Sequence, residues 1–118
     1  MSNWDITVME HKIAELLVET LVSKHLVSVF DGEETTVHKS RDKREVLDAL
    51  QSTDSDTLEV YSLDGKNIGY FWLIWGNGPD LISDYGVNRG GGSASDYLAN
   101  DEVFNGIMLL VEKKMGIL

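Results

Sequence analysis

The longest apolar stretch of the chain runs from Ile68 to Trp75 and contains two of the three tryptophans. Because neither face of this stretch is polar, it predicts a central strand that is covered on both sides. Gly76 to Asp80 contain glycines and the single proline, which is typical of a turn. Leu81 to Tyr85 are predicted to return as a shorter strand, and the rest of the chain is expected to be arranged around this hairpin.

Three segments have apolar residues at helical spacing and are predicted to be amphipathic helices. They cover about residues 2–23, 39–51 and 93–115. Ser2 with Asp5 has the spacing of a capping box, which marks the start of a helix. The residues expected to be buried on the last helix are Leu98, Val103 or Phe104, Ile107, Leu110 and Val111.

Three more segments are rich in β-branched and aromatic residues and are predicted to be strands. They cover residues 26–30, 34–38 and 57–63, and the polar positions of the second are typical of an edge strand. The dipeptides Asp31-Gly32 and Asp64-Gly65 follow the first and the third of them. Asp-Gly accepts the positive φ angles of a type I′ turn, so each dipeptide is predicted to close a hairpin.

The predicted order is a helix, two strands, a helix, three strands and a helix. The strand-to-strand connections are short, which favours an antiparallel sheet with helices packed on it. We therefore predict an α+β fold in which a five-stranded antiparallel meander packs against three helices. A chain of 118 residues is most simply one domain, which here covers residues 1–118.

The chain is acidic: twenty acidic residues against ten basic ones give a formal net charge of −10. Direct binding to nucleic acid or to an anionic membrane is disfavoured, because proteins recognise those surfaces through Lys and Arg. An acidic surface instead favours solubility and fast encounter with a basic partner. The absence of cysteine excludes disulfides and thiolate metal sites. The amino terminus has no signal-peptide pattern, so a cytoplasmic location is expected.

The candidate catalytic groups do not form a recognisable constellation. His11, His25 and His38 have no carboxylate or serine at a spacing that would place it beside them. The motifs HExxH and GxSxG do not occur in the sequence. We therefore expect a protein without enzymatic activity, without a metal site and without a cofactor.

Asp80 and Asp84 are a pair of carboxylates four residues apart. A regular strand would place both on one face, where they could hold a divalent cation or transfer protons. Because the sequence places no third oxygen ligand nearby, we favour a turn-capping role for Asp80 and a solvated position for Asp84.

A loop that could bind an anion leads into the last helix and consists of Arg89, Gly90, Gly91, Gly92 and Ser93. Backbone N–H groups, the helix dipole and the guanidinium could point at the phosphate of a nucleotide. However, the loop does not match a Walker A or a GxGxxG motif, and Asp84 and Asp96 would repel a phosphate. A flexible linker is the favoured interpretation, and a nucleotide-binding protein is the alternative.

The acidic residues could imitate a DNA phosphate backbone if they formed a row at phosphate spacing. The candidates are Glu10, Glu15, Glu19, Asp31, Glu33, Glu34, Asp54, Asp56 and Glu59. Lys and Arg residues are interleaved with them, so a solvated acidic surface is the favoured interpretation. A DNA mimic, or an immunity-type inhibitor of a basic nuclease or DNA-binding protein, is kept as an alternative.

Trp72 and Trp75 point to opposite faces of their predicted strand, because side chains alternate along a strand. Burial of both is the default expectation, but one of them could be a partly exposed anchor for a partner. The candidate binding residues lie on this hairpin or directly after it and are Trp75, Asn77, Asp80, Asp84, Tyr85 and Arg89.

Residues 72–85 show an apolar strand, Gly-Asn, an acidic position, two aliphatic residues and then Asp-Tyr. This pattern resembles a segment of small tailed-phage and prophage proteins of unknown function. The resemblance covers the middle of the chain and brings no catalytic residues. It implies a small viral accessory protein that binds and disables a host factor in the host cytoplasm.

Taken together, the sequence predicts a non-enzymatic, acidic, phage-type accessory protein that binds and inhibits a host macromolecule. A host protein with a basic surface is the expected partner, because the chain itself is acidic. Direct binding to nucleic acid or to membranes is not expected, and formation of a homodimer is left open.

Overall fold

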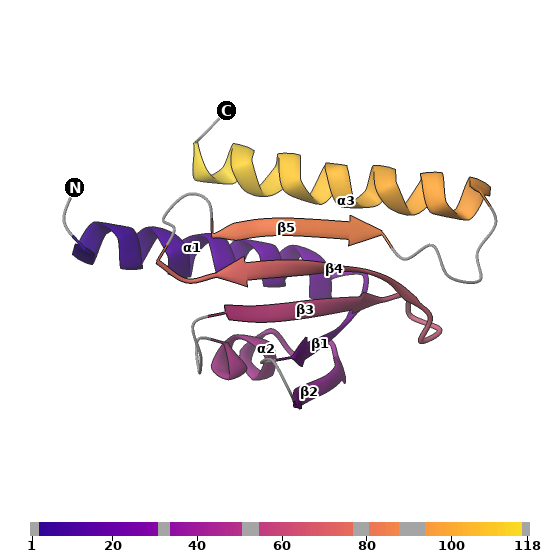
Figure 1. Cartoon of the computed structure of the whole chain (residues 1–118), viewed down its shortest axis with the longest axis horizontal. Helices are drawn as coiled ribbons and strands as arrows, with labels where there is room; N and C mark the ends of the chain where they lie inside the picture. Colours follow the sequence, from indigo (N-terminus) through magenta and orange to yellow (C-terminus); the bar gives the residue numbers. More distant parts are fainter. Residues whose placement is uncertain (1–2, 31–33, 51–54, 77–80, 88–93, 117–118) are drawn as a thin grey trace.

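A computed structural model describes residues 3–30, 34–50, 55–76, 81–87 and 94–116 of the chain (Figure 1). The three helices are α1 (Asn3–Val22), α2 (Lys43–Ala49) and α3 (Ala94–Met115). The five strands are β1 (Leu26–Phe30), β2 (Thr35–Ser40), β3 (Ser55–Tyr61), β4 (Asn67–Ile74) and β5 (Ile82–Val87). The order of the elements is the predicted one.

The five strands form one antiparallel sheet in the order β2-β1-β3-β4-β5, which confirms the predicted α+β class. The last three strands follow one another as a meander. In the first half, β1 rather than β2 lies beside β3, because the segment that contains α2 carries the chain from the edge strand β2 across to β3. The sheet therefore has β2 and β5 as its edges and β3 at its centre.

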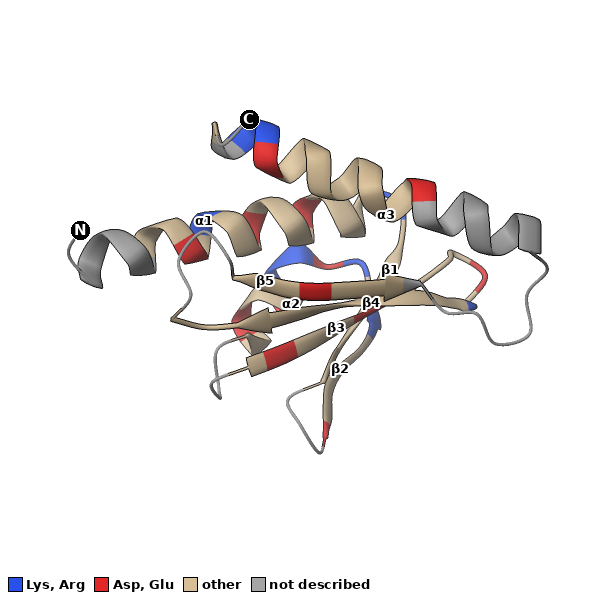
Figure 2. Cartoon of the chain, turned by 45° about the horizontal axis from the view of Figure 1, so that its top comes forward, with Lys and Arg blue, Asp and Glu red and all other residues tan. Residues whose placement is uncertain are grey.

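The helices pack on one face of the sheet, and no helix among the described residues covers the other face (Figures 1 and 2). The strands alternate accordingly: in β4, Phe71 and Leu73 are fully buried under the helices. In β3, Leu58 and Val60 occupy the same face and are also fully buried. Burial of one such side chain contributes about 1.5–3 kcal/mol to folding, so this layer is the main source of stability.

The prediction that the apolar strand is covered on both sides is wrong. Tyr70 and Trp72 alternate with the buried residues of β4 and are 38% and 41% exposed. The apolar run could not reveal this, because aromatic residues are typical of strands whether their face is covered or open.

A cluster of aromatic rings joins α3 to the sheet. The ring of Phe104 stacks on that of Phe71 with a centroid distance of 4.9 Å and an interplanar angle of 5°. Tyr85 of β5 stacks on Phe71 at 5.7 Å. Phe104 can come this close because Gly69 lies under its edge: a Cβ at position 69 would be 2.6 Å from the ring. The absent side chain of Gly69 is therefore what allows α3 to pack here.

The predicted burial of α3 is correct for three residues and wrong for one. Phe104, Ile107 and Val111 are buried, whereas Leu110 is 39% exposed. Leu110 lies beside the buried Val111, at the margin of the apolar stripe of α3. The side chain of Leu98 lies outside the described part of the structure.

The hairpin at Asp64-Gly65 is not the predicted two-residue type I′ turn. The N–H of Gly65 donates to the carbonyl of Ser62, and the N–H of Ser62 donates to the carbonyl of Lys66. Gly65 has a φ of +90°, whereas Asp64 does not have a positive φ. Leu63, Asp64 and Gly65 thus form a three-residue loop in which only the glycine adopts the left-handed conformation. The other dipeptide, Asp31-Gly32, lies outside the described residues.

Helix α2 begins later than predicted. Asp42 is its N-cap, and the carboxylate accepts hydrogen bonds from the N–H groups of Arg44 and Glu45 at 2.9 and 3.3 Å. Lys39 and Ser40, which were expected to open this helix, belong to β2 instead. The helix begins after Asp42, and not at Lys39 or Ser40, because the short carboxylate of Asp42 satisfies two N–H groups of the first turn.

Candidate functional site

The sheet surface that no helix covers is called the open face here. Strand register places on it Leu26, Ser28, Phe30, Ser55, Thr57, Glu59, Tyr61, Tyr70, Trp72, Ile74, Asp84 and Gly86. Tyr70 and Trp72 are its most exposed aromatic side chains. Large aromatic residues that remain this exposed on an ordered sheet are typical of a contact surface.

Carboxylates lie directly beside these two aromatic residues. Asp84 is the cross-strand partner of Trp72, and its Oδ2 is 3.4 Å from the hydroxyl of Tyr70. On the other side of β4, Glu59 is the cross-strand partner of Tyr70. Cross-strand partners have Cβ atoms only about 5 Å apart, so the aromatic rings and the carboxylates form one surface.

Glu59 is held in place by two donors. The hydroxyl of Tyr61 donates to its Oε2 at 2.9 Å, and the side-chain amide of Asn67 donates to the same oxygen at 3.1 Å. Burial raises the pKa of Tyr61, and the hydrogen bond to Glu59 and the charge of that carboxylate raise it further. Tyr61 therefore stays a hydrogen-bond donor at any physiological pH.

The ammonium of Lys39 lies at the Tyr61 end of the open face, away from Trp72. The Lys39 ammonium is 4.9 Å from the centroid of the Tyr61 ring. Tyr61 is four residues along β3 from Thr57, the cross-strand partner of Trp72, which corresponds to about 13 Å along the strand. The side chains paired directly with Trp72 and Tyr70 are the carboxylates of Asp84 and Glu59, and the ammonium of Lys39 lies far from Trp72.

The three α1 residues named as candidates for a DNA-like surface, Glu10, Glu15 and Glu19, do not form an open row that could imitate DNA. Glu10 is only 4% exposed and accepts a hydrogen bond from the N–H of Gly76 at 2.6 Å. Glu15 and Glu19 both pair with the ammonium of Lys43, at 3.4 and 3.7 Å. Figure 2 shows the described acidic residues distributed over several elements rather than along one line.

Trp75, a predicted binding residue, lies just after β4 and is half-buried. Its indole N–H donates to the carboxylate of Asp56 at 2.7 Å, and its ring meets the imidazole of His11 edge-on at 6.0 Å. Asp56 was a candidate for a DNA-like surface, but it is only 1% exposed. The two contacts fix the indole between Asp56 of β3 and His11 of α1.

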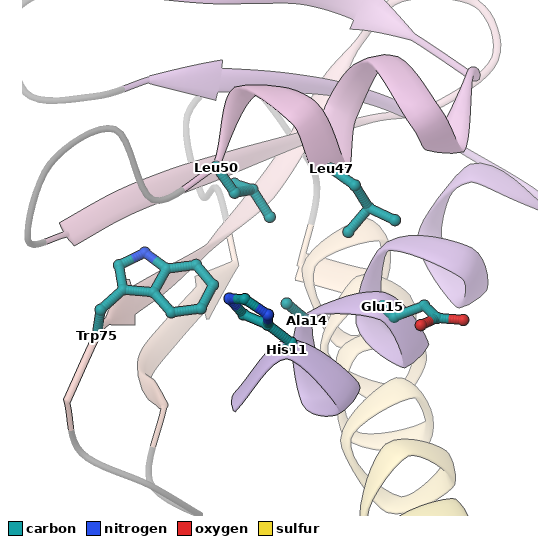
Figure 3. Close-up of a pocket in the computed structure, with 6 residues that line it drawn as sticks. All are labelled: His11, Ala14, Glu15, Leu47, Leu50 and Trp75. Atoms are coloured by element: carbon teal, nitrogen blue, oxygen red, sulfur yellow. The ribbon is translucent and has the colours of Figure 1, made fainter. Parts of the chain in front are cut away.

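A cavity of about 280 Å³, called the Trp75 pocket here, opens between α1, α2 and the end of β4 (Figure 3). It is lined by His11, Ala14, Glu15, Leu47, Leu50 and Trp75. Leu47 belongs to α2 and Leu50 is the C-cap residue of that helix, and both face the residues of α1. Glu15 lies across the pocket from Trp75. No local pattern in the sequence indicates this pocket, because its lining residues come from three separate segments.

The other predicted site residues are placed as follows. Asp84 is exposed, as expected for a solvated position. Tyr85 is half-buried against Phe71 and Phe104, and its hydroxyl donates to Asn105 Oδ1 at 2.7 Å, so it helps to hold α3. Asn77, Asp80, Arg89, Gly90, Gly91, Gly92 and Ser93 lie outside the described residues. The turn-capping role of Asp80 and the flexible glycine linker therefore stay predictions, with the cation pair and the anion loop as their alternatives.

The histidines lie on separate elements: His11 on α1, His25 directly before β1 and His38 on β2. Burial lowers the pKa of His25, and nearby Lys24 lowers it further, while a hydrogen bond with the Leu21 backbone opposes both. Within the described part of the chain, no three His, Asp or Glu side chains are grouped so that they could hold a metal ion.

Comparison of the chain with family models, with curated proteins and with solved structures found no match. The resemblance of residues 72–85 to phage proteins therefore stays a prediction that these comparisons do not support. No helix in the described ranges is long and apolar enough to cross a membrane.

Proposed function

We propose that the chain is a non-enzymatic binding protein that engages another protein through the open face. The observation that carries this proposal is the exposure of Tyr70 and Trp72, 38% and 41%, side by side on an uncovered sheet. Tyrosine and tryptophan contribute large contact area at a low cost in conformational entropy and dominate the energetics of many protein interfaces.

The charges around these residues favour a partner with exposed Lys or Arg side chains. A cation placed over the indole of Trp72 gains a cation–π interaction, and Asp84 beside it supplies a carboxylate. The net charge of −10 adds long-range attraction to a basic surface.

A nucleic-acid partner is disfavoured by the same charges. Some RNA-binding domains stack bases on aromatic residues of an open antiparallel sheet, and Tyr70 and Trp72 resemble that arrangement. In such domains basic groups attract the phosphates, whereas Glu59 and Asp84 would repel them here.

The proposed partner class agrees with the inhibitor role that the resemblance to phage proteins implies. A protein that covers the basic surface of a host factor would block the binding of anionic ligands to that surface. A DNA mimic or an immunity-type inhibitor would share this class of partner. However, Glu10 is buried and Glu15 and Glu19 pair with Lys43, so these three residues of α1 do not supply a DNA-like row. We therefore favour recognition by aromatic residues and carboxylates of the open face.

The test is an affinity capture from a bacterial lysate with immobilised wild-type protein, Trp72→Ala and Leu109→Ala. Leu109 is 56% exposed on α3, away from the open face, and serves as the matched control. A protein retained by the wild type and by Leu109→Ala, but lost with Trp72→Ala, is the expected result. Its retention should weaken as NaCl is raised. Equal retention by all three proteins, or no retention above background, would contradict the proposal.

A further inference from the structure

We infer that the Trp75 pocket is a binding site for a primary ammonium group carried on an apolar stem. The inference is independent of the proposed function, because the pocket lies on the helix side of the molecule and not on the open face. Two features carry it: the shape and chemistry of the walls, and the excess of carboxylates around one end.

The walls suit an apolar stem. Ala14, Leu47 and Leu50 supply aliphatic surface, and the rings of His11 and Trp75 close one end (Figure 3). A volume of about 280 Å³ is small for a drug-sized ligand and suits a chain of several carbons. Binding of such a stem would bury the apolar surface of the pocket walls, and burial of apolar surface is the usual source of affinity in a small pocket.

The walls are also held in a fixed arrangement. The indole of Trp75 is anchored by its hydrogen bond to Asp56, and the adjacent N–H of Gly76 is anchored by Glu10. Asp56 and Glu10 are 1% and 4% exposed, so both anchors are protected from water. A preformed pocket loses less conformational entropy on binding than a mobile one.

The charge at the far end selects a cation. The carboxylate of Glu15 lies across the pocket from Trp75, and its side chain is 46% exposed. The ammonium of Lys43 lies between Glu15 and Glu19, at 3.4 and 3.7 Å. One positive charge between two carboxylates leaves a net negative charge, so a second ammonium entering beside Glu15 is attracted.

The shared chemistry of the ligand is an ammonium head at Glu15 and a stem that reaches toward the rings of Trp75 and His11. Two sources present it: a free alkylamine, and the side chain of a lysine in a peptide. The experiment separates the two sources by using a probe for each.

The experiment is a titration followed by NMR on the indole N–H signals, which are assigned with one Trp→Phe variant for each tryptophan. The probes are hexylamine, its neutral analogue hexanol, and Nα-acetyl-lysine N-methylamide as a lysine side chain in a peptide-like frame. All three probes are compared at the same pH of about 8, at which an alkylamine carries its proton. Saturable shifts of the Trp75 signal are expected, with hexylamine binding about threefold or more tightly than hexanol.

Three variants connect the signal to the charges. Glu15→Gln should weaken hexylamine binding by about threefold and leave hexanol unchanged. Lys43→Gln removes the competing ammonium and should tighten hexylamine binding. Glu19→Gln is the matched control: Glu19 pairs with the same lysine but does not line the pocket, so this variant should not weaken binding.

Opposite effects of Glu15→Gln and Lys43→Gln support the inference, because a purely structural role of the ion pair would make both variants act in the same direction. Binding of the lysine probe as well as hexylamine identifies a peptide side chain as a possible source, and binding of hexylamine alone identifies a free amine. Equal affinity for hexylamine and hexanol, or no saturable shift of the Trp75 signal, overturns the inference.

Discussion

Substitution of Gly69 by alanine should destabilise the protein, because this glycine makes the contact between the sheet and α3 possible. A Cβ at position 69 would lie 2.6 and 2.8 Å from ring atoms of Phe104 and 2.4 Å from the backbone carbonyl oxygen of Gly86. These separations are far shorter than normal van der Waals contacts, which begin at about 3.5 Å. The ring must therefore move, and with it the stack of Phe104 on Phe71.

The expected cost follows from the contacts that are lost. Overpacking in a close-packed core typically costs about 1–3 kcal/mol, and the contact with a backbone oxygen places Gly69→Ala in the upper half of that range. For a chain of 118 residues this corresponds to a fall in the melting temperature of roughly 8–12 °C. The assay is urea unfolding followed by far-UV circular dichroism, together with a thermal melt.

Gly106 provides the matched control. It lies inside α3, and a Cβ there would meet no atom within 4 Å. Gly106→Ala should therefore stabilise the protein by about 0.5–1 kcal/mol, because alanine favours a helix over glycine. If Gly69→Ala lowers the free energy of unfolding and Gly106→Ala raises it, the room available for the new methyl group determines the effect, and not the loss of a glycine as such.

A double-mutant cycle with Phe104→Leu tests the stated cause. Leucine lacks the Cε2 and Cζ atoms that the new methyl group would meet, so Gly69→Ala should cost less in that background. The rescue should be partial, since the contact with the Gly86 carbonyl remains. Gly69→Ala within 0.5 kcal/mol of the wild type, or strict additivity with Phe104→Leu, would refute the reasoning.

Further predictions concern a helix cap, a buried hydrogen bond and a histidine. Asp42→Ala should cost about 1 kcal/mol in urea unfolding, because two N–H groups of α2 lose their acceptor; Asp42→Asn, which keeps an acceptor, should cost much less. Trp75→Phe should cost about 1–3 kcal/mol in the same assay, since it removes the donor from the buried carboxylate of Asp56, whereas Trp72→Phe on the open face should change stability by less than about 0.5 kcal/mol. The pKa of His25 is lowered below its ordinary value of 6.5 in the folded state, so protonation favours the unfolded state. Stability should therefore fall as the pH drops below about 6.5, and His25→Gln should reduce that slope in chemical denaturation at several pH values.

Periodicity in the sequence was sufficient to predict the order of the helices and strands along the chain, but not which strands lie next to each other in the sheet. The strand at 26–30 was predicted with its observed bounds, because its β-branched and aromatic residues give a strong local signal. The position of β1 beside β3 was not predicted, since it depends on where α2 packs. A connection through a helix can place the next strand beside either strand of a preceding hairpin, and local patterns do not distinguish the two.

The candidate site was predicted less well than the fold. The sequence indicated that Trp72 and Trp75 point to opposite faces, and the structure places Trp72 on the open face and Trp75 in a pocket. Asp84 was chosen as a surface carboxylate, but its position beside Trp72 depends on the pairing of β4 with β5. The Trp75 pocket depends in addition on α1 and α2, so no pattern within one segment could have indicated it.

The side chains of β4 point alternately to the two faces of the sheet, and this alternation places the two proposed binding sites on opposite sides. Tyr70 and Trp72 point to the open face, whereas Phe71 and Leu73 point to the core. Trp75 follows the strand and turns its indole to Asp56 and His11 on the helix side. A change at Trp72 should therefore affect capture of a basic protein without affecting hexylamine binding, and a change at Glu15 should do the reverse. If either variant changed both the capture of a basic protein and the binding of hexylamine, the two sites would have to be coupled through the core between them. The close packing of Phe71 and Leu73 in that core gives no reason to expect such coupling.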